Sequence, residues 1–89
     1  MAVRVFIVDD HEVVRRGLID LINAEPDLEV VGDAGNAHDG LQQILEAKPD
    51  IAVLDVRLPD GSGAQVLQWA RLNLGWELAV VVLTACDDE

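Results

Sequence analysis

Residues 3–10 read VRVFIVDD, a mostly aliphatic run that ends abruptly in Asp9 and Asp10. A short, nearly continuous apolar run of this kind is typical of a strand covered on both faces of a parallel sheet. Three further runs with the same character follow along the chain, at residues 28–31, 51–54 and 78–83. The sequence therefore predicts buried strands separated by connecting segments.

The connecting segments have helical spacing. Apolar residues recur at three- and four-residue steps over 13–22 and again around 41–45, and the second of these helices ends before Pro49, because proline cannot continue a helix. A third helix is predicted over about 62–74, with Gly75 as its left-handed cap. The order β-α-β-α-β-α-β predicts an α/β fold, a doubly wound parallel sheet with helices on both faces.

Composition limits the function. The chain has 89 residues, a length that is enough for one core and one domain over residues 1–89. Its 6 basic and 17 acidic side chains give a net charge of −11. Nucleic-acid binding depends on Lys and Arg neutralising phosphates, so this segment is not expected to contact nucleic acid directly. Cys86 is the only cysteine, which excludes an internal disulfide and a Cys-based zinc site. With no segment resembling a signal peptide or a membrane span, we expect a cytoplasmic protein without membrane contact.

Polar residues follow three of the predicted strands. Asp9 and Asp10 end the first, Asp55 ends the third and Thr84 ends the fourth. Strands about 4.8 Å apart bring such carboxylates close together if these strands are neighbours. Crowded carboxylates repel one another unless a divalent cation neutralises them, and an all-oxygen site suits Mg²⁺. The pattern favours a metal site at this edge.

Simpler interpretations stay open for the individual residues. Asp10 can be the N-cap of the following helix, and Asp9 a solvated loop residue. His11 is interpreted as a surface residue at the helix start rather than as a ligand, since Mg²⁺ prefers oxygen. Asp55 leads into a turn signal at 59–61, Pro-Asp-Gly, which is compatible with a functional role for it.

Three stretches resemble a known family. The stretch VDDHEVVRRGL at 8–18, the stretch DVRLPDGSG at 55–63 and the stretch LTA at 83–85 resemble the receiver domain of bacterial two-component response regulators, in particular those of the LuxR/NarL type. The resemblance covers essentially the whole chain. It implies a flavodoxin-like receiver fold with strand order 2-1-3-4.

The resemblance also implies roles for single residues. Asp55 would be the phosphoacceptor for a sensor histidine kinase, and Thr84 the switch hydroxyl that binds the phosphoryl group. Asp9, Asp10, Asp55 and the main-chain carbonyl of Arg57 would hold Mg²⁺. In a full-length relative, this chemistry would control a DNA-binding transcription output.

The chain departs from the family pattern at its C-terminal side. A fifth strand, the last helices and a lysine at the end of that strand are expected in the family, and the only lysine here, Lys48, precedes the third strand. We therefore interpret the chain as a receiver domain that is incomplete at its C-terminus. An uncovered fourth strand or first helix would favour self-association.

Two functions other than phosphoryl acceptance are alternatives for this chain. An enzyme with an aspartate nucleophile, such as a phosphatase, needs a second acid two residues after it, and Arg57 stands there instead. We therefore expect no enzyme, only a self-phosphorylating acceptor with slow hydrolysis. The remaining alternative is a phosphorylation-incompetent receiver fragment that acts as an interaction or dimerisation module.

Overall fold

The computed structural model describes residues 2–55, 57–62, 65, 68, 72 and 79–83. Its elements are β1 (Val3–Val8), α1 (Glu12–Asn23), β2 (Leu28–Ala34), α2 (Ala37–Ala47), β3 (Ile51–Asp55), β4 (Arg57–Leu58), β5 (Gly61–Ser62) and β6 (Ala79–Leu83).

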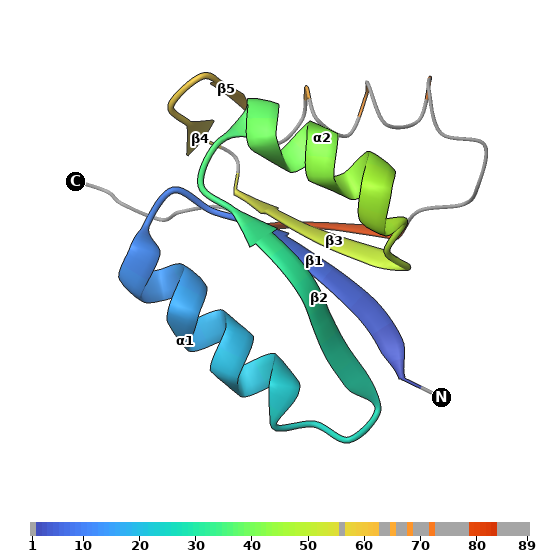
Figure 1. Ribbon diagram of the computed structural model, residues 1–89. Helices are drawn as coiled ribbons and strands as arrows, with labels where there is room; N and C mark the ends of the chain where they lie inside the picture. The colour runs from blue at the N-terminus through green and yellow to red at the C-terminus, as the bar shows by residue number, and fades with distance from the viewer. Residues whose placement is uncertain are drawn as a thin grey trace.

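The four long strands form one parallel sheet in the order β2-β1-β3-β6. This is the predicted order 2-1-3-4 of a doubly wound sheet, and the predicted fold class is confirmed. Figure 1 shows α1 and α2 on opposite sides of the sheet. The short strands β4 and β5 pair with each other as an antiparallel hairpin, whose turn is the predicted one at Pro59 and Asp60.

The core lies between the sheet and α2. β1 is central in the sheet, and its last four residues, Val5 to Val8, are all buried. Alternate side chains of a strand point to opposite faces, and Phe6 and Val8 are the two that join Ile44 of α2 and Leu54 of β3 in the main apolar cluster. The stretch from Val5 to Val8 is apolar because its side chains are buried on both faces of the sheet.

The other face of the sheet is covered less completely. Helix α1 forms where the spacing predicts it, yet it contains no buried residue. Val13 is 85% exposed and Leu21 is 70% exposed, whereas Leu18 and Ile22 are half-buried. Only part of the apolar face of α1 therefore packs against the strands described.

Some boundaries differ from the prediction. Strand β2 continues to Ala34 because it keeps its pairing with β1 to the end of that strand. Ser62, the expected start of the third helix, belongs to β5. Within 62–74, residues 65, 68 and 72 are helical. The other residues predicted for this helix beyond 62, and its Gly75 cap, lie outside the described residues.

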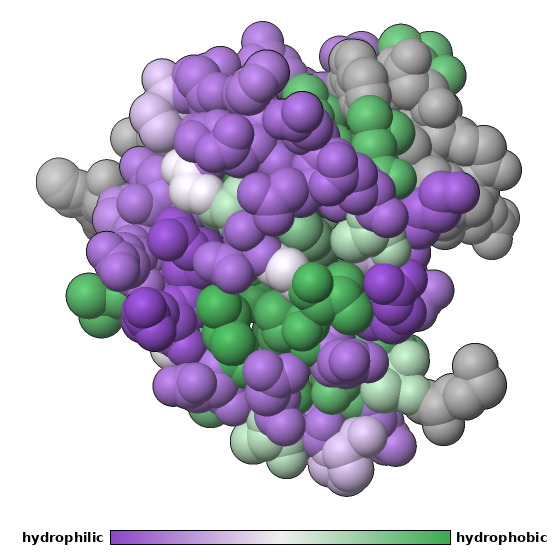
Figure 2. Space-filling model, in the orientation of Figure 1, coloured by the Kyte–Doolittle hydropathy of each residue, from purple (hydrophilic) through white to green (hydrophobic). Residues whose placement is uncertain are grey.

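The described surface is mainly polar. Figure 2 shows hydrophilic side chains over most of the face it presents, with a hydrophobic patch over β2 between α1 and α2. Among the described residues, no helix is long and apolar enough to span a membrane.

Candidate functional site

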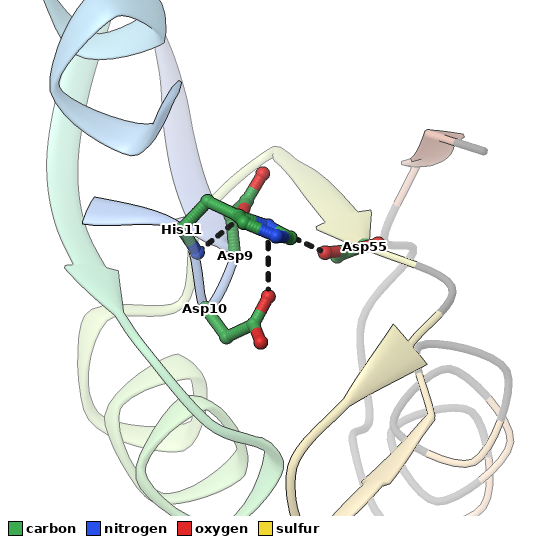
Figure 3. A group of neighbouring side chains, drawn as sticks. All are labelled: Asp9, Asp10, His11 and Asp55. Atoms are coloured by element: carbon green, nitrogen blue, oxygen red, sulfur yellow. Dashed lines mark hydrogen bonds and ion pairs between the residues drawn. The ribbon is translucent and has the colours of Figure 1, made fainter. Parts of the chain in front are cut away.

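The carboxyl ends of β1 and β3 bring acidic side chains together. Val8 pairs with Leu54, so Asp9 and Asp55, the residues that follow them, lie beside each other on neighbouring strands. Both are buried, with 5% of Asp9 and 3% of Asp55 exposed. Asp10 lies next to them and is more exposed. Figure 3 shows their side chains converging on one point together with His11.

The distances suit a shared cation. One ligand atom each from Asp9, Asp10, His11 and Asp55 lies within 4.8 Å of the others. Three carboxylates this close repel one another when ionised, and a divalent cation removes that repulsion. Two of the three carboxylates, those of Asp9 and Asp55, are buried. Carboxylate oxygens are the donors that Mg²⁺ prefers. The residues present therefore fit a hard divalent cation.

The other two predicted site residues are placed less fully. Arg57 begins β4, two residues beyond Asp55, and pairs with Ser62. Thr84 directly follows β6 in sequence and lies outside the described residues. Lys48, the only lysine, caps α2 just before β3 and so lies at the opposite edge of the sheet from the acids.

Asp9 is held firmly in place. Its backbone N–H donates to the carbonyl of Ala34, 3.1 Å away, and its Oδ1 accepts the backbone N–H of His11 at 2.8 Å. The Nη1 of Arg15 donates to the Asp9 carbonyl. The interpretation of Asp9 as a solvated loop residue is therefore wrong, because the residue is buried and takes part in these three hydrogen bonds.

His11 takes the N-cap position that was considered for Asp10, and its side chain makes no cap hydrogen bond. Its ring turns toward the acids instead. The Nδ1 atom lies 3.0 Å from Asp10 Oδ1, 3.3 Å from Asp9 Oδ1 and 3.8 Å from Asp55 Oδ2. The hydrogen bond with Asp9 and the charge of Asp10 raise the pKa of the imidazole above its ordinary 6.5.

Arg15 is a positioning residue that the sequence reasoning missed. Its Nε donates to Asp33 Oδ2 at 2.8 Å while its Nη1 reaches the Asp9 carbonyl, so it ties α1 to the ends of β1 and β2. The available signal was its position one helical turn after His11, which places it at the same end of α1 as the acids.

The hairpin after Asp55 is attached to α2. Asp60 Oδ1 accepts the backbone N–H of Ala37 at 2.7 Å, and its Oδ2 accepts that of His38 at 3.0 Å. These two hydrogen bonds hold the pKa of the Asp60 carboxyl below its ordinary value. The turn signal at 59–61 predicted the turn, but neither the short strands around it nor this long-range cap.

Comparison with known proteins leads to the family that the sequence resembles. The family model for the response regulator receiver domain matches residues 5–89. The DNA-binding transcriptional activator DevR/DosR of Mycobacterium tuberculosis is 59% identical over 64 residues, which are 72% of this chain and 30% of that protein. The transcriptional regulatory protein LiaR of Bacillus subtilis is 31% identical over 87 residues, 98% of this chain and 41% of LiaR. The chain thus spans less than half the length of these curated relatives.

Solved structures agree on the fold. The signal receiver domain of the response regulator NarL from Mycobacterium tuberculosis superposes with a TM-score of 0.89 at 33% identity, covering 98% of this chain and 69% of that one. A LuxR-family two-component response regulator from Aurantimonas sp. SI85-9A1 gives the same TM-score at 31% identity, over 98% of this chain and 61% of that one. Sequence and structure both lead to LuxR/NarL-type regulators, and the chain belongs to the family of response regulator receiver domains.

Proposed function

We propose that this chain accepts a phosphoryl group on Asp55 from a sensor histidine kinase. The observation that carries the proposal is a buried carboxylate at the carboxyl end of an inner strand, with the ligand atoms of Asp9 and Asp10 within 4.8 Å of its own. In doubly wound sheets, ligands bind outside the carboxyl ends of the strands. Charged side chains are rarely buried unless they are paired or functional, and the burial of Asp55 therefore supports a chemical role for it.

The proposed step transfers one phosphoryl group. A carboxylate oxygen of Asp55 forms the new O–P bond as the P–N bond to the kinase histidine breaks, and the electron pair of that bond stays on the leaving imidazole, which takes a proton from solvent. Catalysis of such a transfer is mainly positioning and neutralisation of charge. The product is an acyl phosphate that water hydrolyses slowly, so the domain is an acceptor and not a turnover enzyme.

The metal ligands proposed are Asp9, Asp10, Asp55 and the main-chain carbonyl of Arg57. Mg²⁺ bound there supplies the positive charge that lets an anionic carboxylate approach an anionic phosphoryl group. Asp9 is held by its backbone and by Arg15, so its carboxylate direction is set before any cation binds. Thr84 is proposed as the switch hydroxyl, on the resemblance and on its position after β6.

The output is proposed from the relatives. DevR/DosR is a DNA-binding transcriptional activator, and we infer that phosphorylation of this domain, residues 1–89, controls a transcription output in the cytoplasm. The kinase docks on this segment and DNA does not, in keeping with a net charge of −11.

Intact mass after incubation with a small acyl phosphate tests the acceptor chemistry. We expect a gain of one phosphoryl group that requires Mg²⁺ and is absent in Asp55→Asn. Asp60→Asn is a matched control, because it removes a carboxylate of the adjacent hairpin and leaves the acceptor. A folded wild-type chain that gains no phosphoryl group with Mg²⁺ present contradicts the proposal and favours the phosphorylation-incompetent interaction module.

A second proposal is self-association through α1 or β6. The observation that favours it is the exposure of Val13, Val14 and Leu21 on α1, three large apolar side chains on one helix. Exposed apolar surface on a helix favours association in water. Among the strands described, β6 pairs on one side only, with β3, which leaves a second route by strand pairing.

A further inference from the structure

Histidine is an unusual residue at a helix N-cap, and His11 is the N-cap of α1. N-cap positions favour Ser, Thr, Asp and Asn, whose side chains accept a backbone N–H of the first helical turn. The His11 side chain makes no such bond. Its ring instead lies over the three carboxylates, as Figure 3 shows, with Nδ1 no more than 3.8 Å from an oxygen of each. The side chain of His11 therefore contacts the acidic site, while its backbone carbonyl accepts the N–H of Arg15 at the helix start.

The Nδ1 atom lies about as far from the Asp10 and Asp9 oxygens as two neighbouring ligands of one ion lie from each other. Two ligands at right angles around an ion about 2.1 Å from each are ~3.0 Å apart, and opposite ligands are ~4.2 Å apart. The Nδ1 atom lies 3.0 Å from Asp10 Oδ1 and 3.3 Å from Asp9 Oδ1. All four ligand atoms lie within 4.8 Å of one another. The imidazole nitrogen thus stands at ligand distance from the carboxylate oxygens and adds a different donor type.

Donor type decides which metal a site prefers. Mg²⁺ takes oxygen ligands, whereas imidazole nitrogen suits first-row transition ions. His11 is 62% exposed at its side chain, so the ring has solvent on one side and can adjust to an ion. We propose that His11 Nδ1 is a fifth protein ligand, beside the three carboxylates and the Arg57 carbonyl, so that this site binds a divalent first-row transition ion more tightly than Mg²⁺ through a metal–nitrogen bond. The inference rests on the divalent-cation site of the proposed function.

The test compares Co²⁺ and Mg²⁺ binding by calorimetry, and nitrogen coupling to bound Mn²⁺ by pulsed electron paramagnetic resonance. His11→Ala removes the ligand without removing a helix cap, because the ring makes no cap bond. His38→Ala is the matched control, since it removes the other histidine of the chain, an exposed one on α2. We expect His11→Ala to lose at least ~10-fold in Co²⁺ affinity, with Mg²⁺ affinity within about twofold of wild type. The nitrogen coupling is expected in wild type and His38→Ala and absent in His11→Ala.

Two results overturn the inference alone. One is Mg²⁺ and Mn²⁺ binding by wild type without nitrogen coupling. The other is a His11→Ala variant that binds Co²⁺ and Mg²⁺ both more tightly, which would make the ring a cation that competes with the metal. Failure of wild type to bind any of these ions overturns the divalent site itself, and with it the metal part of the proposed function. Phosphoryl gain on Asp55 is measured separately, so the two failures are distinguishable.

Discussion

Gly40 shows how one missing methyl group sets the distance between α2 and the sheet. A Cβ added there would lie 2.9 Å from Cγ2 and 3.2 Å from Cγ1 of Val8, which is fully buried in β1. Valine is stiff at χ1 and cannot turn its methyl groups away at small cost. Gly17 is also inside a helix, but a Cβ there would meet nothing within 4 Å. The same residue type thus has a packing role in α2 and none in α1.

Alanine substitutions at these two glycines are therefore expected to act in opposite directions. Gly17→Ala should stabilise the domain by ~1 kcal/mol, because alanine is the better helix former. Gly40→Ala gains the same helix preference but overpacks the core, which costs about 1–3 kcal/mol, so we expect a net loss of up to ~2 kcal/mol. Urea denaturation of both variants measures the difference. A Gly40→Ala variant as stable as Gly17→Ala would contradict the close packing of α2 on β1.

The contact between the β4-β5 hairpin and α2 is the clearest long-range feature at the level of elements. The first N–H groups of a helix have no partner within it. In α2, Asp60 accepts two of them, those of Ala37 and His38, and Asn36 accepts that of Asp39. A negative charge at a helix N-terminus is also favourable with respect to the helix dipole. The hairpin and the helix therefore stabilise each other through Asp60.

We expect the Asp60→Ala variant to unfold at a lower temperature than wild type, by an amount that depends on pH. The folded-state pKa of Asp60 is below its ordinary 3.8, so its stabilisation is complete above that value and is lost as the pH falls through the lower, folded-state pKa. The difference in Tm should be largest near neutral pH and shrink in acid. Asp20→Ala, an exposed acid on α1, controls for the loss of one negative charge. A difference in Tm that stays constant with pH would contradict the charged cap.

At the scale of the whole molecule, cover is uneven between the two faces of the sheet. The α2 face contains the main apolar cluster, whereas α1 has no buried residue on the other face. Exposed Val13 and Leu21 are the apolar side chains that a second copy would cover first.

A self-associating domain should show a mass that rises with concentration in analytical ultracentrifugation. The double variant Val13→Gln and Leu21→Gln should weaken the association at least ~10-fold, because burying such a side chain is worth about 1.5–3 kcal/mol. Leu45→Gln on α2 is the control and should associate like wild type. Wild type that remains a monomer at every concentration would contradict self-association by either route.

The apolar runs predicted the strands, and the residues that follow them predicted the edge where the acids end, because both are local signals. The strand order of the sheet was implied by the resemblance to receiver domains. The sequence could not predict which side chains meet residues far away along the chain. Arg15 bonds to Asp33, 18 positions away, and Asp60 bonds to Ala37, 23 positions away, so both contacts depend on the assembled sheet. His11 is an exposed residue at the helix start, as predicted, but the contact of its ring with Asp55 was not predicted. Its position before a helix is typical of a surface residue, and only the neighbouring strand brings Asp55 close enough to interact with it.

The Asp60 cap also has a spectroscopic consequence. Hydrogen bonds to a carboxylate move amide proton resonances strongly, so Ala37 and His38 each provide a signal that depends on the position and charge of a residue in the hairpin. That hairpin begins two residues after Asp55. A chemical change at the end of β3 can therefore be followed from the amides of α2, without a label on Asp55 itself.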